Sequence, residues 1–234
     1  MKRIALIGAE GFVGTSIAKA LSSKKQTDLV KVNRQNYELI RNEGTYDILI
    51  NAAMPSKRFW AQQNPAKDFI ETTQKTLKLV NDWNWKKIIQ ISSISARSQL
   101  TTVYGRHKAA AEKLVGYGDN LILRLGPMYG ERLNKGVLVD LLEDRTVFVD
   151  KDSRYCFAPV DWIGVWIANN LDLSGVMDLG GNQAIRIGEV AEAIRSKSQF
   201  QGAIDNQILT EPIAGAPFAS GVISFVRKLK ENKG

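Results

Sequence analysis

The chain has 234 residues, of which 44% are hydrophobic and 24% charged, and this composition suits a globular protein of one domain, or of one domain with a small second lobe. Its single cysteine, Cys156, excludes an intrachain disulfide framework and a zinc ribbon. No apolar run approaches the roughly 18 residues of a membrane span, and Gly8 and Glu10 interrupt the first apolar run too early for a signal peptide. We therefore expect a reduced, cytoplasmic protein with no metal site and no membrane partner.

The net charge of +8 favours a partner that carries negative charge, such as nucleic acid, an anionic surface or a phosphorylated small molecule. The basic residues are scattered in pairs rather than gathered in one run. Trp83 and Trp85 stand beside Lys86 and Lys87, as in a platform for stacked bases. We favour a simpler interpretation, in which the two aromatic residues anchor a helix end before a strand. The expected partner is then a small molecule and not nucleic acid.

Apolar runs of strand length alternate with stretches of helical period over the first half of the chain. The expected strands, rich in Ile, Leu and Val, cover residues 4–7, 29–32, 48–50, 88–91 and 121–125. The expected helices between them cover residues 12–21, 65–80 and 103–116. This alternation predicts an α/β fold whose parallel sheet carries helices on both faces, that is, a doubly wound Rossmann sheet.

The pattern becomes less regular after residue 126. Helices are expected at 137–142, 161–171, 187–194 and 222–230, and a strand at 176–179. We therefore expect a dinucleotide-binding core over residues 1–126 and a small C-terminal substrate lobe over residues 127–234. Segments within about residues 155–180 are expected to return to the core.

Three glycines follow the first predicted strand directly and open the first predicted helix. Gly8 allows a tight turn, Gly11 lets the backbone approach a diphosphate, and Gly14 allows close contact between helix and strand. The free N–H groups and the dipole of the helix start attract an anion. The segment therefore predicts a dinucleotide site.

The end of the second predicted strand bears on which dinucleotide binds. Folds that bind NAD place an acidic residue there, on the ribose 2′-hydroxyl. Here the strand ends in Asn33 and Arg34, with no carboxylate. A guanidinium cannot accept a hydrogen bond from that hydroxyl but pairs well with a 2′-phosphate. Arg34 thus favours NADP, and NAD stays possible.

A tyrosine and a lysine, Tyr104 and Lys108, share one face of a predicted helix. Upstream, a strand ends in Ser92 and Ser93, whose hydroxyls can face a cleft. At this point the chain resembles the extended short-chain dehydrogenase/reductase superfamily, in its branch that acts on nucleotide sugars. The matching segments, in chain order, are GAEGFVG at 8–14, DILINAA at 47–53, ISS at 91–93, YGRHK at 104–108, LRLGPMYG at 123–130, RYCFAPVDW at 154–162 and DLGGNQAIRIGEV at 178–190.

The resemblance implies catalytic roles for three side chains. Tyr104 would be the general acid and base, Lys108 would lower its pKa and hold the nicotinamide ribose, and Ser93 would polarise the substrate carbonyl or hydroxyl. Ser92 remains the alternative serine. The phenol of tyrosine ordinarily has a pKa of about 10. General acid–base catalysis near neutral pH therefore needs a positive charge close to it.

The resemblance also implies binding residues. Arg154, ahead of Asp161, would contact the diphosphate of a nucleotide sugar, and Ser93 would touch the sugar. The cofactor would be held by Gly8, Glu10, Gly11, Phe12, Val13, Gly14, Asn33, Arg34, Ala52, Ala53, Tyr104, Lys108 and Pro127. Members commonly form homodimers through helices that flank the sheet, here residues 65–80 and 103–116.

The sequence also departs from the family pattern. The stretch between Ser93 and Tyr104 is short, Thr72 stands near the place of a usual asparagine, and no acid pair follows Ser93. Dehydratase members carry such acids, so we expect reduction of a keto group on a nucleotide-linked sugar rather than dehydration. Two alternatives remain open: an epimerase with retained NAD, and a non-catalytic NADP-binding regulator.

Three further residues receive structural interpretations. His107, the single histidine, is expected at the surface, facing away from Tyr104 and Lys108. Cys156 lies in an apolar stretch and is expected to fill space in the core. Asp161 is expected to be the N-cap of a helix.

Overall fold

A computed structural model describes residues 1–232, and the chain divides into two compact units. The first unit comprises Met1–Leu125 and Ile163–Asp178. The second comprises Gly126–Trp162 and the residues from Leu179 onward. The chain thus leaves the first unit after the fifth strand, returns once, and leaves it again.

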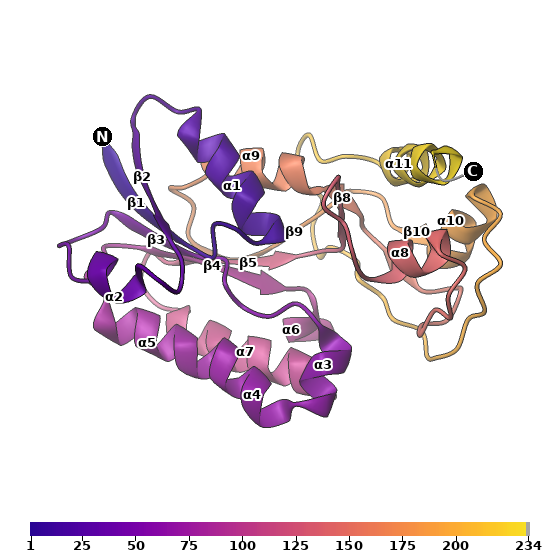
Figure 1. The fold of residues 1–234 in the computed structure, drawn as a ribbon, viewed down its shortest axis with the longest axis horizontal. Coiled ribbons are helices and arrows are strands. Elements are labelled where there is room, and N and C mark those ends of the chain that lie inside the picture. The colour runs from indigo at the N-terminus through magenta and orange to yellow at the C-terminus, as the bar shows by residue number, and fades with distance from the viewer. Residues whose placement is uncertain (233–234) are drawn as a thin grey trace. The chain divides into compact units, whose positions relative to one another are not determined.

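A six-stranded sheet forms the centre of the first unit (Figure 1). Its strands are β1 (Lys2–Ile7), β2 (Thr27–Val32), β3 (Ile48–Asn51), β4 (Ile88–Ser93), β5 (Leu121–Leu125) and β9 (Gly175–Leu179). They stand in the order β2-β1-β3-β4-β5-β9, and the pairs among β1 to β5 are parallel. The order reverses between β1 and β3, which is where open α/β sheets bind ligands. The predicted fold class is confirmed.

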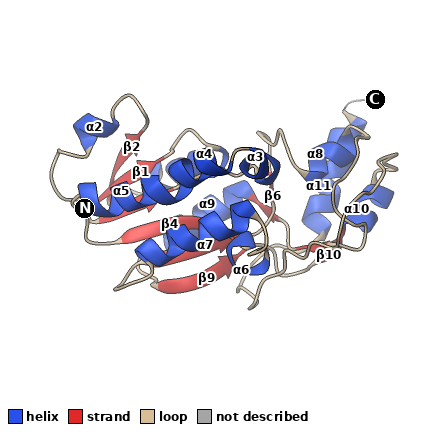
Figure 2. Ribbon diagram, turned by 90° about the horizontal axis from the view of Figure 1, so that it is seen from below, coloured by secondary structure: helices blue, strands red, loops and turns tan. Residues whose placement is uncertain are grey.

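Helices cover both faces of this sheet, with α1 and α9 on one face and α4, α5 and α7 on the other (Figure 1). In Figure 2, α5 and α7 lie side by side. The helices are α1 (Phe12–Ser22), α2 (Tyr37–Ile40), α3 (Arg58–Gln63), α4 (Pro65–Phe69), α5 (Lys75–Asp82), α6 (Ser95–Ser98), α7 (Val103–Val115) and α9 (Val160–Asn169).

The segment predicted as one helix over residues 65–80 is interrupted by a π-helical turn, Ile70–Gln74. A π-helical turn holds one residue more than an α-helical turn and needs no special residue type. The apolar pattern of the sequence therefore does not reveal it.

The core of the first unit consists of aliphatic strand residues with little exposure, including Ile4, Leu49, Ile89 and Leu123. Trp83 is also buried, with its ring centroid 5.3 Å from that of Tyr37 and 5.5 Å from that of Tyr46. This confirms Trp83 as a helix-end anchor, because it is buried at the C-cap of α5 and packs against two neighbouring rings.

Within residues 126–162 and 179–232, the second unit contains two small sheets and three complete helices. Strands β6 (Met128–Tyr129) and β8 (Ala158–Pro159) form one pair, and β7 (Arg154–Tyr155) and β10 (Ile185–Arg186) form the other. Its helices are α8 (Val137–Leu142), α10 (Ile187–Ala193) and α11 (Ser220–Glu231). They enclose an apolar cluster of Leu138, Leu141, Ile187, Val190, Val222 and Val226. The predicted helices of this half are confirmed, whereas two-residue strands are too short to show an alternating pattern.

Cys156 and Asp161, two residues given structural interpretations, lie on either side of β8. Cys156 is buried, as predicted. The N-cap assignment of Asp161 is wrong, because α9 begins at Val160, directly after β8, and Asp161 lies in its first turn. A carboxylate there still interacts favourably with the helix dipole. Within residues 1–232, no helix has the length and apolar character needed to cross a membrane.

Candidate active site

The glycine turn lies tightly against the loop that follows β3. Gly8 adopts a φ of +81°, in the left-handed region that favours glycine, and a Cβ there would lie 2.8 Å from the Cα of Ala53. A Cβ on Gly14 would overlap the carbonyl of Gly8. Both positions therefore require glycine, and the turn brings Gly8 next to Ala52 and Ala53, two of the predicted cofactor residues.

The start of α1 is open to an anion. Gly11 is the N-cap in extended conformation, no side chain caps the helix, and its first turn holds no acidic residue. Phe12 and Val13, the first two helical residues, are half-buried. Backbone N–H groups without side-chain acceptors and the positive end of an 11-residue helix suit a diphosphate. A dinucleotide cofactor therefore fits this turn.

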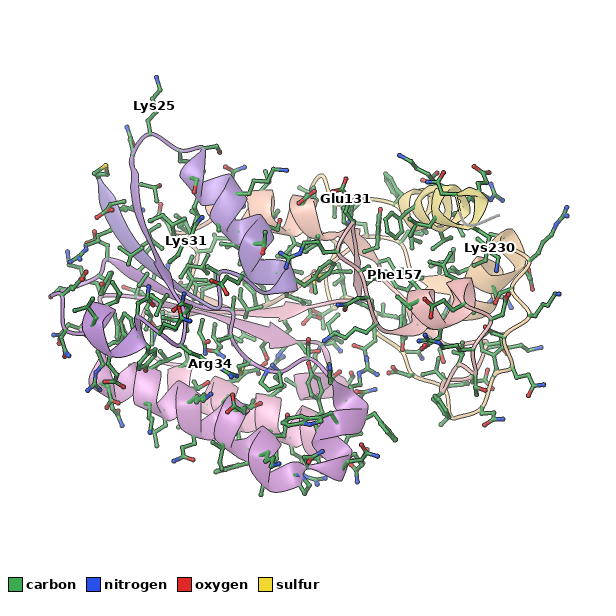
Figure 3. All side chains as sticks on the ribbon, viewed as in Figure 1. Lys25, Lys31, Arg34, Glu131, Phe157 and Lys230 are labelled. Atoms are coloured by element: carbon green, nitrogen blue, oxygen red, sulfur yellow. The ribbon has the colours of Figure 1, made fainter. Side chains whose placement is uncertain are left out.

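Two opposite charges lie near the end of β2. The Asn33 amide donates to a carboxylate oxygen of Glu10 at 3.4 Å, and its own oxygen accepts from the backbone N–H of Gln35 at 2.9 Å. Arg34 is exposed on the same loop (Figure 3), and within residues 1–232 no acceptor contacts its guanidinium. Glu10, Asn33 and Arg34 were all predicted cofactor residues, and the fold places the Glu10 carboxylate beside Asn33.

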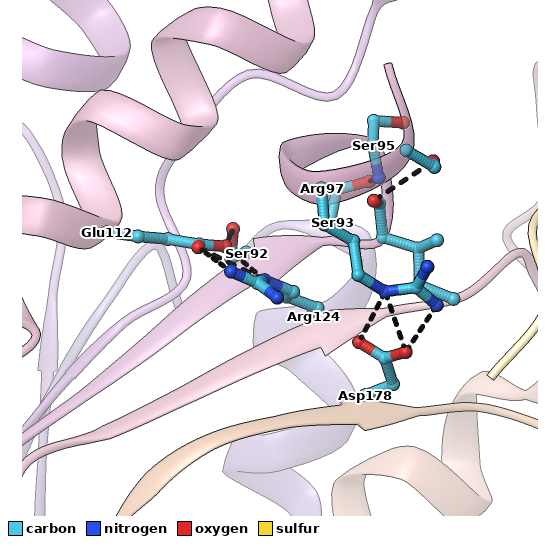
Figure 4. A network of polar contacts seen from close by, with 9 residues as sticks. Ser92, Ser93, Ser95, Arg97, Glu112, Arg124 and Asp178 are labelled. Atoms are coloured by element: carbon cyan, nitrogen blue, oxygen red, sulfur yellow. Dashed lines mark hydrogen bonds and ion pairs between the residues drawn. The ribbon is translucent and has the colours of Figure 1, made fainter. Parts of the chain in front are cut away.

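The two serines at the end of β4 point in different directions, because successive strand residues alternate between faces. The buried Ser92 hydroxyl donates to Glu112 at 2.6 Å. Ser93 accepts from the backbone N–H of Ser95 at 3.2 Å (Figure 4), and its hydroxyl lies near enough to Tyr104 to lower the pKa of the phenol. Of the two candidate serines, Ser93 is the one beside the tyrosine.

Tyr104 and Lys108 meet on α7. Both residues are buried, and the Lys108 Nζ lies 5.4 Å from the centroid of the Tyr104 ring. Thr102 caps the helix by accepting from the N–H of Gly105 at 3.0 Å. A Cβ on Gly105 would overlap the carbonyl of Gln99, so glycine lets this end of α7 approach the segment that follows Ser93. The fold thus brings Ser93, Tyr104 and Lys108 together.

The electrostatics of Tyr104 differ from the expectation. Burial raises the pKa of its phenol above the ordinary value, and this outweighs the lowering by the positive charge of Arg58 and by the hydrogen bond from Ser93. The negative charge of Asp68 raises the pKa further. The expectation of a lowered pKa is therefore wrong for the protein alone, because removal from water dominates.

His107 is only partly exposed, less than the prediction of a surface position implied. Its Nδ1 lies 2.7 Å from a carboxylate oxygen of Asp68, its side chain is 18% exposed, and that of Asp68 is fully buried. The i, i+3 spacing from Tyr104 places His107 near the same side of α7, where α4 packs. The prediction overlooked that spacing.

Two further ion pairs join helices to strands of the central sheet (Figure 4). Arg97 of α6 donates to Asp178 of β9, with Nε–Oδ2 at 3.0 Å. Arg124 of β5 donates to Glu112 of α7, with Nε–Oε1 at 3.0 Å. The pairs fix α6 and α7 to the sheet on either side of Ser93. Sequence reasoning found neither, because the partners share no local spacing.

Two predicted residues belong to the second unit. The carbonyl of Pro127 accepts from the N–H of Ala158 at 3.0 Å, and Arg154 is exposed on β7. In the first unit, Thr72 lies in the π-helical turn, fully buried, and its hydroxyl has no partner within the described residues 1–232. The roles expected for Pro127 and Arg154 stay predictions.

Neither a protein-family model nor a curated protein sequence matches the chain. Solved structures, however, are similar over nearly its whole length. UDP-glucuronic acid 4-epimerase from Bacillus cereus, in complex with UDP-glucuronic acid and NAD, is 17% identical with a TM-score of 0.75, and the match covers 99% of this chain and 100% of that chain. dTDP-4-dehydrorhamnose reductase from Yersinia enterocolitica is 16% identical with a TM-score of 0.74, covering 99% of both chains. RMD from Pseudomonas aeruginosa, complexed with NADPH, is 15% identical with a TM-score of 0.74, again covering 99% of both. At such identities the likeness establishes the fold alone, so this chain shares with these structures a parallel, doubly wound α/β sheet.

Proposed function

We propose that the protein is an NADP-dependent oxidoreductase that reduces a keto group on a nucleotide-linked sugar. The observation that carries the proposal is that the half-buried Ser93 lies near the buried Tyr104 and Lys108 at the end of β4, in the same unit as the glycine turn. The similar structures support it, since they include a reductase, a protein complexed with NADPH and an epimerase bound to a nucleotide sugar.

The cofactor would be held by residues of the first unit. The backbone of the glycine turn would bind the diphosphate, Arg34 would pair with the 2′-phosphate, and Lys108 would hold the nicotinamide ribose. The reduced nicotinamide, when bound, supplies a hydride and becomes positively charged as it is oxidised.

The chain's own residues would manage the proton. Ser93 donates a hydrogen bond to the sugar carbonyl oxygen and so polarises it. As that oxygen gains negative charge, Tyr104 transfers its phenolic proton to it, which leaves a sugar hydroxyl and a phenolate. The ammonium of Lys108, over the tyrosine ring, stabilises the phenolate until a proton returns from solvent.

Epimerisation with retained NAD is the second candidate, and one contact favours it. The Glu10 carboxylate lies beside Asn33, at 3.4 Å. A carboxylate there accepts hydrogen bonds from ribose hydroxyls and repels a 2′-phosphate. A non-catalytic regulator is less favoured, because cofactor sensing alone does not need Tyr104 and Lys108 together.

Incubation with NADPH and a panel of 4-keto nucleotide sugars tests the proposed function. The absorbance of reduced nicotinamide follows turnover, and chromatography identifies the sugar product. We expect oxidised cofactor in amounts equal to the reduced sugar. Conversion of a nucleotide sugar without net oxidation of cofactor indicates the epimerase instead, and binding of NADPH without any conversion indicates the regulator.

Replacement of Arg34 by alanine is expected to weaken NADPH binding by about 1.5–3 kcal/mol, or roughly 10- to 150-fold in Kd, because a charge-assisted contact is lost. NADH binding should not change, and the unmodified protein should prefer NADPH. Titration of nicotinamide fluorescence measures all four affinities. Lys25→Ala, which removes an exposed cation before β2 (Figure 3), is the matched control. Equal affinities for both cofactors, or an unchanged Kd in Arg34→Ala, contradict the assignment to NADP.

Arg154 is proposed to bind the diphosphate of the substrate, because a guanidinium fork can contact two phosphate oxygens at once. Arg154→Ala should weaken the binding of UDP or dTDP, measured by calorimetry, and leave NADPH affinity unchanged. Arg227→Ala, an exposed arginine of the same unit, is the control. If the parent binds no nucleoside diphosphate, or the variant binds it equally well, the nucleotide-sugar assignment fails and a reductase of another substrate remains.

We also propose a homodimer through the helices beside α7. The segment from α4 to α5 exposes three large apolar side chains, Phe69, Ile70 and Leu77. Apolar side chains gathered on one helical segment favour burial against a second copy. Sedimentation equilibrium should give a dimer, which Leu77→Glu should weaken.

A further inference from the structure

A fully buried carboxylate on α4, that of Asp68, contacts His107 of α7, which lies three residues after Tyr104 on that helix. Asp68 of α4 is 0% exposed, and one carboxylate oxygen contacts Nδ1 of His107 at 2.7 Å. The other oxygen has no hydrogen-bond partner within residues 1–232. Because a buried carboxylate with an unsatisfied oxygen is costly, Asp68 contributes little to stability as it stands. Stability alone therefore does not explain why a carboxylate is buried at this position.

Two more contacts join His107 to the segment around Asp68. The Thr73 hydroxyl, in the π-helical turn, donates to the carbonyl of His107 at 3.3 Å. The Phe69 ring meets the imidazole edge-on, with centroids 5.5 Å apart. These contacts hold α4 and the π-helical turn against α7, with Asp68 beside His107.

Arg58 carries a positive charge on α3, the helix that packs against Tyr104 through Ala61. Ala61 of α3 packs against Val103 and Tyr104, and Arg58 lies one helical turn before Ala61, on the same face. Arg58 is half-buried. The two charges act on the phenol in opposite directions, since Arg58 lowers the pKa of Tyr104 and Asp68 raises it. Ser93 of β4 and Lys108 of α7 also lie near Tyr104.

We propose that Asp68 and Arg58 are positioning residues of opposite effect for the Tyr104 phenol, with His107 holding the carboxylate. Asp68 disfavours the phenolate and keeps the proton on Tyr104, which a proton donor needs before the hydride arrives. Arg58 favours the phenolate and eases the release of that proton. The catalytic meaning of this balance rests on the proposed function, whereas the electrostatic effect does not.

Titration of the Tyr104 phenol tests the effect without any need for turnover. The chain has six tyrosines, so the ultraviolet difference between each protein and its Tyr104→Phe counterpart isolates one phenolate. We expect Asp68→Asn to move the ionisation midpoint to lower pH, because a negative charge has been removed. Arg58→Gln should move it to higher pH. Titrations without and with bound NADP+ should show the same two signs.

Matched variants separate charge from packing. Lys67→Gln and Lys57→Gln remove exposed charges next to Asp68 and Arg58 and should leave the midpoint in place. His107→Asn keeps a donor near the position of Nδ1 and should do the same. Arg58→Lys keeps the charge and should retain the parental midpoint. If Asp68→Asn does not fold, the two Arg58 variants still test the proposal.

The outcomes are distinct. Opposite shifts in Asp68→Asn and Arg58→Gln, followed in the pH profile of turnover, support the proposal. An unchanged midpoint in both variants, or shifts of the same sign, overturns it, even where turnover falls. Opposite shifts in a protein that reduces no keto sugar leave this inference standing and remove the proposed function instead.

Discussion

Tyr104→Phe is expected to lower the rate of keto-sugar reduction by about 10²–10⁴-fold, the range that general acid catalysis contributes. The substitution removes the proton donor but little volume, and the phenylalanine ring can keep the packing that Tyr104 makes against Ala61 and Val103. NADPH affinity should stay near the parental value, because the glycine turn and Arg34 are untouched. Steady-state kinetics and a fluorescence titration on the same preparation measure both.

A second tyrosine provides the control for this substitution. Tyr117, just after α7, is 53% exposed, and Tyr117→Phe should leave turnover unchanged. If Tyr104→Phe retained near-parental turnover, Tyr104 would be structural, and the non-catalytic regulator would become the better account.

Glu112→Ala is expected to lower the free energy of unfolding by about 3 kcal/mol, because it leaves the Arg124 guanidinium half-buried without its partner. Glu112 accepts from Arg124 at 2.6, 3.0 and 3.1 Å and from Ser92 at 2.6 Å, and its side chain is 6% exposed. Urea denaturation measures the loss. Turnover should also fall, since this pair holds α7, and with it Tyr104, against β4 and β5.

A surface pair of the same kind gives the comparison. Glu71 contacts Lys75 on the outer helices, where the two side chains are 32% and 47% exposed. Glu71→Ala should cost less than about 1 kcal/mol, because solvent screens exposed pairs. A similar small cost for both variants contradicts the view that the Glu112–Arg124 pair anchors α7.

The parts of the fold that local pattern determines could be predicted from the sequence. Buried parallel strands appear as short aliphatic runs, so β1, β3, β4 and β5 are visible in the sequence. The glycine turn is visible for a similar reason, because Gly8 needs a positive φ and Gly14 has no room for a Cβ. Tyr104 and Lys108 follow from helical spacing.

The parts that were missed depend on contacts between distant segments. Asp68 precedes His107 by 39 positions, and their contact exists only because α4 packs against α7. Arg97 and Asp178 are 81 positions apart and meet only across the sheet. One signal was available: the i, i+3 spacing of Tyr104 and His107 places both on adjoining parts of one helical surface. The pKa of Tyr104 was misjudged for a related reason, since desolvation depends on how completely the fold buries the phenol.

Transfer of deuterium from labelled cofactor tests the central claim most directly. NADPH that carries deuterium at its transferable position is incubated with the protein and a 4-keto nucleotide sugar, and the product is examined by NMR. We expect deuterium on the new carbinol carbon, in amounts equal to the NADP+ formed, and far less in the same time with Tyr104→Phe. A converted nucleotide sugar without deuterium, or no conversion of any keto sugar by a protein that binds NADPH, contradicts the account.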